Sequence, residues 1–370
     1  MKPVWPIVSG VCATMTGVGL SRFAYAPLLP AIVQAGLLSG GQAGALGAIN
    51  LGGYLFGAAL APAFGRKMGL GWALRLAMLC ATFCFLMCAI PGGLFWLAPW
   101  RALTGVSGGV LMVLAGPAVQ AVVPVAMRGL AAGLVFAGVG GGIVIGALLV
   151  PAMLPHGLPA TWLALAALAA FLTVVSWRLW PRVAAPPAMR LPRLAGRAGL
   201  MVLSYAFAAV AQTVHMVWWP DFIARGLGEG PARGALFWVL YGVAGACGPA
   251  FYGKLADRVG AARALQVAMA VQSLALALPL LSHGNPVLVL SALCAGGTAV
   301  GSTALTLTRA REIGGANGPG LWRISTMGFG LAQTAMGFFL AWLYTASGGH
   351  TALFVVGLVA ALLAFATARR

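Results

Sequence analysis

The sequence predicts an all-α polytopic membrane protein, with twelve transmembrane helices arranged as two pseudo-symmetric halves of six. Of its 370 residues, 61% are hydrophobic and only 7% are charged, whereas about 25% of the residues of a soluble globular protein are charged. The apolar segments are about 20 residues long, the length that crosses the hydrocarbon core of a bilayer as a helix. Segments such as WLALAALAAFLTVVSW are apolar on every side, unlike the alternating strands of an outer-membrane barrel.

Short loops that contain proline, glycine or basic residues separate the apolar segments, and each segment defines one predicted helix. The predicted spans are residues 5–33, 43–64, 72–90, 95–123, 129–153, 160–180, 198–223, 232–255, 262–281, 286–309, 319–344 and 350–368. The first segment begins like a signal peptide, but its apolar run continues and further spans follow. We therefore expect it to be the first helix and not a cleaved leader.

The basic residues indicate the orientation of these helices. The chain has 22 Lys and Arg residues against 4 Asp and Glu, a formal net charge of +18. With the N-terminus in the cytoplasm, most basic residues fall in the inner loops, and the outer loops contain only Arg225 and Arg233. The positive-inside rule therefore predicts a multi-pass protein of the bacterial inner (plasma) membrane with both termini in the cytoplasm. Because topology explains the positive charge, we expect no nucleic acid partner.

The chain resembles a tandem repeat. A Pro- and Arg-rich inner loop at 181–197 separates a six-helix bundle over 1–180 from a second one over 198–370. GYLFGAALAPAFG in the first half and YGVAGACGPAFYG in the second each place a tyrosine upstream of Pro-Ala-Phe, and RFAYAPLLP aligns with QTVHMVWWP. Parallel repeats of this kind are typical of secondary transporters, whose substrate sites lie near the midplane at the repeat interface.

The segment GKLADRVG, with Gly253, Asp257, Arg258 and Gly260, resembles the G-x-x-x-D-R-x-G loop signature of the major facilitator superfamily. We expect it in the inner loop between spans 8 and 9. The resemblance implies a gating role, in which Asp257 gains a basic partner or caps a helix in one conformation and loses that contact in the other. A plain solvated turn is the alternative.

The first half departs from this signature. APAFGRKMG keeps Gly65, Arg66 and Lys67 but places Pro62 and Ala63 where Asp and Arg would stand.

Four stretches resemble the bacterial YbfB/YjiJ-type branch of that superfamily: GLSRFAYAPLLP, INLGGYLFGA, GLVFAGVGGGI and FGLAQ. The resemblance implies the twelve-span superfamily fold, a transport function with a largely unassigned substrate, and a monomer. The glycines at 138–142 lie in the middle of a span, so we expect them to pack against a neighbouring helix and not to bind phosphate.

Three arginines, Arg22, Arg101 and Arg323, fall within apolar segments, and the first two lie deep in their spans. Arg22 is roughly 25 Å along the first helix, and Arg101 lies about 9 Å into the fourth from the outer side. A charge at bilayer depth costs about 2.5–3.5 kcal/mol, so it normally faces a cavity or a partner. All four acids, Asp221, Glu229, Asp257 and Glu312, belong to the second half. Because guanidinium binds carboxylate or phosphate in a bidentate manner, the arginines point to an anionic substrate.

Both arginines can instead have structural roles. Arg22 can extend outward to the interface, and Arg101 can bind helix-end carbonyls or lipid headgroups. In the superfamily fold, spans 1 and 4 border the central cavity, so the resemblance implies that both guanidiniums face it.

Further polar residues lie at a similar depth and are candidates for the cavity lining, although each can equally form an interhelical hydrogen bond. They are Tyr25, Asn50, Tyr54, Gln212, His215, Tyr241, Thr298, Ser302 and Gln333. The repeat alignment sets Arg22 against Gln212 and Tyr25 against His215. His215 is either a proton carrier or a hydrogen-bonding residue, and Asp221 is expected at a solvated outer rim.

The sequence therefore predicts a secondary transporter that moves a small organic anion by alternating access, with or without a coupled proton. Efflux of amphipathic compounds and a non-transporting scaffold or sensor are the alternatives. No nucleophile–base pair is visible, so we expect no enzyme. We also expect no cofactor or metal, since the stripe formed by Cys80, Cys84 and Cys88 is explained by packing.

Overall fold

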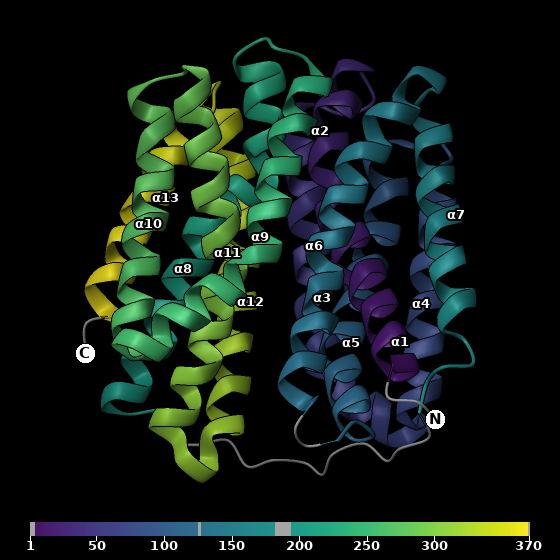
Figure 1. Cartoon of the computed structure of the whole chain (residues 1–370). Helices are drawn as coiled ribbons and strands as arrows, with labels where there is room; N and C mark the ends of the chain where they lie inside the picture. Colours follow the sequence, from purple (N-terminus) through teal and green to yellow (C-terminus); the bar gives the residue numbers. More distant parts are fainter. Residues whose placement is uncertain (1–3, 125–126, 182–193, 369–370) are drawn as a thin grey trace. The chain divides into compact units, whose positions relative to one another are not determined.

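The computed structural model describes residues 4–124, 127–181 and 194–368. Within these ranges the regular secondary structure is helical (Figure 1). The elements are α1 (Val4–Thr14), η1 (Met15–Phe23), α2 (Tyr25–Gln34), α3 (Gly40–Met68), α4 (Leu70–Cys88), α5 (Gly93–Gln120), α6 (Arg128–Met153), η3 (Leu154–His156), α7 (Leu158–Ser176), α8 (Gly196–Asp221), η4 (Phe222–Gly226), α9 (Pro231–Val259), α10 (Ala261–Leu281), α11 (Asn285–Gly314), η5 (Gly315–Asn317), α12 (Gly318–Ser347) and α13 (Thr351–Ala368).

Twelve helices of the described chain are long and apolar enough to cross a membrane, which confirms the predicted number of spans. The first is continuous from Val4 to Gln34 and combines α1, η1 and α2, where η1 is a π-helical segment. The seventh combines α8 with the π-helical η4 and runs from Gly196 to Gly226. The hydropathy of the sequence was sufficient to locate these helices, because a helix that crosses lipid consists predominantly of apolar residues.

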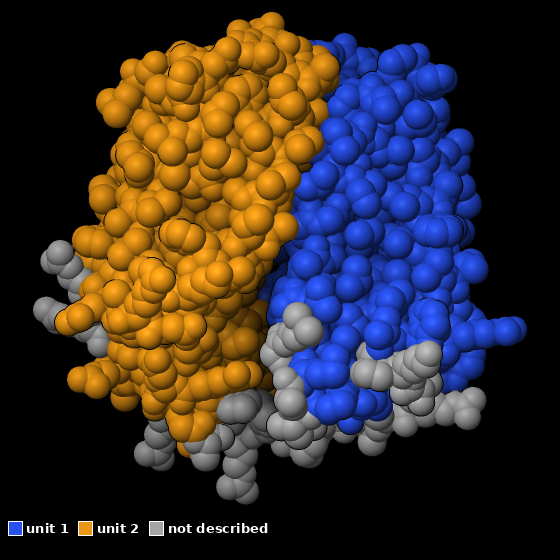
Figure 2. Space-filling model, viewed as in Figure 1, with its two compact units in different colours: residues 1–188 blue, residues 189–370 orange. Residues whose placement is uncertain are grey.

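The chain divides into two compact units, residues 1–188 and 189–370, which Figure 2 shows in blue and orange. In the first unit α3 packs on α5, α4 on α5 and α7, and α6 on α1 and η1. In the second unit α9 packs on α11, and α13 packs on both α8 and α10. Most of the predicted linker, 181–197, lies outside the described residues.

Glycine allows close contact between α6 and the first span. A Cβ added to Gly142 would lie 2.6 Å from the Cα of Gly19 in η1, which is too close for any side chain. The two backbones therefore touch at a position where only glycine fits. This contact confirms that the glycine run of span 5 serves helix packing.

The loop signature of the second unit lies on a helix, which corrects the prediction that it forms the loop itself. α9 continues to Val259, so Gly253, Asp257 and Arg258 occupy its last two turns. Only Gly260 forms the connection to α10, with φ of 83°. A residue with a side chain rarely adopts that backbone conformation, which explains the glycine.

The same connection occurs in the first unit. Gly69, with φ of 78°, joins α3 to α4. Gly69 and Gly260 occupy equivalent turns. Arg66 and Lys67 precede Gly69 by three and two residues, as Asp257 and Arg258 precede Gly260, so they stand at equivalent positions. The alignment that set Pro62 and Ala63 there was therefore wrong by one helical turn, and the first unit has a basic residue in place of the aspartate.

Candidate functional site

Arg101 is anchored to the first span at its π-helical segment. Its side chain is only 1% exposed, and its Nη1 donates a hydrogen bond of 2.6 Å to the carbonyl of Ser21. The guanidinium carbon lies 4.5 Å from the centre of the Tyr25 ring, a cation–π contact. π-helical segments are frequent at functional sites because they shift the backbone register locally. Arg101 is therefore buried and held by α5, η1 and α2 together.

Arg22 lies on the same π-helical segment and is only partly buried. Its guanidinium carbon is 5.4 Å from the ring centre of Tyr54 on α3 and 5.5 Å from that of Phe23. Tyr25 is fixed independently, because its hydroxyl donates to the carbonyl of Ala43 at 2.7 Å. The two arginines thus meet at one short segment, since the carbonyl that holds Arg101 belongs to the residue before Arg22.

Asn50 supports the backbone of Arg101. Its amide nitrogen donates to the Arg101 carbonyl and to the Thr104 hydroxyl, both at 3.0 Å. The described structure thus brings the five candidates of the first unit together, and we call this group the arginine site: Arg22, Tyr25, Asn50, Tyr54 and Arg101. Ser21 and Thr104 were not predicted from the sequence. Thr104 lies one helical turn beyond Arg101, which was a usable signal, whereas the acceptor on Ser21 is a backbone carbonyl that no side chain signals.

The arginine site contains a buried donor nitrogen that lacks an acceptor. Within the described part of the chain, the Nε of Arg101 has no hydrogen-bond acceptor. A buried donor left unpaired costs about 1–3 kcal/mol, and more when the group is charged. The first unit contains no Asp or Glu that would compensate the charge. The arginine site is consequently able to accept a negative group.

The candidates of the second unit are mostly occupied by contacts between their own helices. Gln212 on α8 donates to Ser302 on α11 at 3.0 Å, and Thr298 donates to the side-chain oxygen of Gln272 on α10. Tyr241 is stacked on Trp238, with ring centres 4.4 Å apart. The amide nitrogen of Gln333 approaches the sulfur of Met216 at 3.8 Å. The contacts of Gln212, Thr298 and Gln333 join α8, α10, α11 and α12. These buried polar residues therefore serve to hold the helices of the second unit together.

His215 is completely buried and lies between aromatic rings. Its Nε2 is 3.0 Å from the hydroxyl oxygen of Ser291, and that hydroxyl donates to the carbonyl of Ala275 at 2.7 Å. Because the single hydroxyl proton of Ser291 is used, the histidine must be the donor, so Nε2 carries a hydrogen. The rings of Trp219 and Phe354 lie 4.8 and 5.6 Å away. His215 therefore acts as a hydrogen-bonding residue between α8 and α11.

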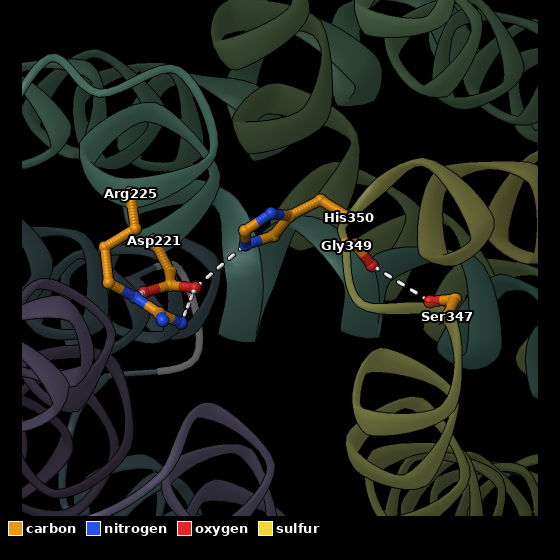
Figure 3. A network of polar contacts seen from close by, with 5 residues as sticks. All are labelled: Asp221, Arg225, Ser347, Gly349 and His350. Atoms are coloured by element: carbon orange, nitrogen blue, oxygen red, sulfur yellow. Dashed lines mark hydrogen bonds and ion pairs between the residues drawn. The ribbon is translucent and has the colours of Figure 1, made fainter.

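Asp221 is not at a solvated rim; it is completely buried and ion-paired, which corrects the sequence prediction. Nε and Nη2 of Arg225 bind its two carboxylate oxygens at 2.5 Å each. Nε2 of His350, in the turn before α13, lies 2.8 Å from Oδ2 (Figure 3). We call these three residues the Asp221 cluster. The four-residue spacing of Asp221 and Arg225 was a signal for a helical ion pair, whereas nothing in the sequence places His350 nearby.

The remaining candidates lie apart from these groups. Asp257 and Arg258 are both exposed at the end of α9. Cys84 and Cys88 are buried in α4, and Cys80 is partly buried. Among the residues that the structure describes, no three His, Cys, Asp or Glu side chains are close enough to hold a metal ion.

Twelve membrane-length helices, six in each of two compact units, define a polytopic α-helical membrane protein. Comparison with protein families identifies the branch: residues 14–369 match the model described as uncharacterised MFS-type transporter YbfB, and the chain belongs to this family. The chain is thus a transporter of the major facilitator superfamily. A search of curated proteins found no match.

Proposed function

We propose that this transporter moves a small organic anion across the bacterial inner membrane by alternating access, with the negative group of the solute bound at the arginine site. The observation that carries the proposal is the contact between Arg101 and the carbonyl of Ser21. It places a buried guanidinium beside the backbone of a second arginine, Arg22, in a unit without any carboxylate.

The uncompensated charge of Arg101 favours an anion over a neutral or cationic solute. A buried charge costs several kcal/mol unless a counter-charge is present. Arg101 has only a carbonyl and an aromatic ring as partners among the contacts described above, and both are weaker than a carboxylate. An anionic solute supplies the missing charge, and it also supplies an acceptor for the Nε of Arg101.

The geometry of the site favours a small solute group. Tyr25 and Asn50 fix the guanidinium and the backbone of Arg101 by side-chain contacts at 4.5 and 3.0 Å. A rigid donor loses little conformational entropy on binding, so a single carboxylate or phosphate is sufficient to occupy it. Tyr54 and Phe23 present ring faces beside Arg22, which suit an apolar body next to the negative group.

The topology is part of the proposal. The excess of Lys and Arg in alternate loops supports cytoplasmic termini, and the superfamily default supports a monomer. For the signature at the end of α9, we propose that Asp257 forms a partner contact in only one conformation and thereby gates transport. Asp257→Asn would then slow flux without weakening solute binding, while Glu312→Gln, an exposed acid at the end of α11, would leave flux unchanged.

The test is transport and binding by purified protein, wild type beside Arg22→Gln. Small carboxylates, amino acids, phosphates and lipophilic cations are screened for thermal stabilisation, because a ligand that binds the folded state raises the melting temperature. The compounds that stabilise are then measured as flux into proteoliposomes. Arg323→Gln is the matched control, since Arg323 also lies in an apolar helix but outside the arginine site.

The proposal predicts that an anion stabilises the wild type and Arg323→Gln, and that Arg22→Gln loses both stabilisation and flux. If lipophilic cations stabilise all three proteins alike and no anion does, the anion proposal is wrong and efflux of amphipathic compounds takes its place. If no solute is transported in either direction, the protein does not work as a transporter of these solute classes.

A further inference from the structure

The second unit contains a cavity of about 490 Å³ beside the Asp221 cluster. Its wall is formed by η4, the end of α10, the end of α12 and the start of α13. Small-molecule sites typically measure about 300–1,000 Å³, so the volume is adequate for a ligand with one ring. The whole lining belongs to the second unit, so this cavity is separate from the arginine site of the first unit.

The polar side chains of this wall are hydrogen-bond donors or bases. Arg225, His283 and His350 line the cavity. Among the described lining residues none is Asp or Glu, because the carboxylate of Asp221 lies behind the wall with no exposed surface. The cavity is thus able to donate hydrogen bonds to a negative group and offers no acid to repel it.

The Asp221 cluster holds Arg225 and His350 in place. Asp221 binds Arg225 through Nε and Nη2 at 2.5 Å, and its Oδ2 is 2.8 Å from Nε2 of His350. Figure 3 shows both side chains converging on the carboxylate. Nη1 of Arg225 takes no part in this pair. A guanidinium fixed in this way is preorganised, which reduces the entropy lost when a ligand binds.

The apolar part of the wall is aromatic. Phe222, Tyr344 and Phe354 line the cavity together with Pro279 and Leu280. The ring centres of Phe222 and Phe354 lie 4.9 Å apart, and Tyr344 is fixed by stacking on Trp218 at 4.7 Å. Ring faces of this kind bind a flat apolar body by offset or edge-to-face contacts.

We propose that this cavity is a second ligand site, specific for a small aromatic carboxylate. The ring of the ligand lies against Phe222 and Phe354, and its carboxylate accepts hydrogen bonds from Arg225 and His283. On the proposed topology the site opens toward the outer face. It goes beyond the proposed function, because neither Arg22 nor Arg101 lines this cavity.

The first experiment measures binding to the full-length purified protein by calorimetry and thermal stability. The probes are phenylacetate, its neutral analogue phenylacetamide, ring-free acetate, and the cation phenethylammonium. We expect phenylacetate to bind about tenfold or more tightly than each of the others, since each lacks one of the two recognised parts or carries the wrong charge. Equal binding of all four, tightest binding of the cation, or no binding of phenylacetate would overturn the proposal.

Two variants locate the site. Gly349 lines the cavity, and a Cβ added there meets no atom within 4 Å, so the side chain of Gly349→Leu starts in open space and is chosen to fill the cavity. Thr351→Trp reduces the volume from an exposed position at the start of α13. Gly199→Leu is the control, because Gly199 is equally open but lies at the other end of α8. Gly349→Leu and Thr351→Trp should each weaken phenylacetate binding about tenfold, and Gly199→Leu should leave it unchanged.

The same variants separate this proposal from the function proposed above. Phenylacetate binding that survives Arg22→Gln but is lost in Gly349→Leu supports the cavity. Binding that is lost in Arg22→Gln and retained in both cavity variants overturns the second site and instead supports the arginine site. Phenylacetate binding that all variants retain overturns it as well.

Discussion

The guanidinium of Arg101 lies over the ring of Tyr25 at 4.5 Å, a contact between the fourth and first helices of the first unit. The first and fourth helices of the second unit are also joined by side chains. The repeat alignment sets Tyr25 against His215, and Nε2 of His215 on α8 lies 3.0 Å from the hydroxyl oxygen of Ser291 on α11. An arginine and a tyrosine form the contact in the first unit, whereas a histidine and a serine form it in the second.

Replacement of Arg101 by lysine tests whether anion binding depends on the planar guanidinium or on the positive charge alone. Lysine keeps the positive charge but lacks the planar fork that donates to the Ser21 carbonyl and lies over Tyr25. We predict that Arg101→Lys remains folded and binds the transported anion about tenfold more weakly. Binding is measured by calorimetry, with Arg323→Lys as the control. Wild-type affinity in Arg101→Lys would show that Arg101 only holds the helices together.

Loss of the Asp221 carboxylate should destabilise the second unit strongly. Asp221→Asn leaves the partly buried Arg225 beside a neutral amide and removes the charged partner of His350. Removing one partner of a buried ion pair costs about 3–5 kcal/mol. We predict a decrease of this size in the free energy of unfolding, measured by denaturant titration in mixed micelles.

The chain contains a matched control for this pair. Glu229 and Arg233 have the same four-residue spacing, but their side chains are 36% and 38% exposed. An exposed pair contributes only about 0–1 kcal/mol, so Glu229→Gln should change stability little. An equal decrease in the free energy of unfolding in Asp221→Asn and Glu229→Gln would show that burial of Asp221 does not strengthen its ion pair.

The contact between Gly142 and Gly19 predicts an unusually sensitive glycine. In Gly142→Ala the new methyl would lie 2.6 Å from the backbone of η1, so α6 and the first span must separate. Such overpacking costs about 1–3 kcal/mol, and we expect a lower melting temperature together with slower transport. Gly133→Ala, on the same helix, meets no atom within 4 Å and should raise or preserve the melting temperature. An unchanged melting temperature in Gly142→Ala would be evidence against this packing.

His215 is expected to matter for stability and not for proton movement. It donates to Ser291 and is enclosed by Trp219 and Phe354, with no charged side chain among these contacts. We predict that His215→Gln keeps the dependence of flux on external pH and lowers stability slightly. The measurement is flux into proteoliposomes over a range of pH values. A pH dependence that disappears in His215→Gln would assign the coupled proton to this residue.

The twelve spans and the grouping of the first unit's polar residues were predictable from the sequence, whereas the partners of those residues were not. Hydropathy alone locates a helix in lipid. A guanidinium at bilayer depth indicates a cavity or a polar partner, because burying an uncompensated charge is costly. However, the acceptor of Arg101 is a backbone carbonyl in a π-helical segment, and no side chain in the sequence signals it.

Asp221 illustrates a second limit. Its position beside Pro220 near the predicted end of a span favoured a solvated rim. The structure extends the helix through the π-helical η4 to Gly226 and brings His350, 129 residues later, onto the same carboxylate. Burial at this position is decided by the turn between α12 and α13, which depends on tertiary packing that one sequence does not reveal.

The single-glycine connections at Gly69 and Gly260 also have a practical consequence for studying this protein. Since α3 ends at Met68 and α4 begins at Leu70, the joint contains no spare backbone, and the same is true between Val259 and Ala261. A protease recognition sequence or reporter peptide inserted at either joint would interrupt a one-residue turn between two helices, whereas insertions are best tolerated at exposed loop tips. Inserted probes therefore belong elsewhere in the chain, and the two joints are best treated as rigid turns.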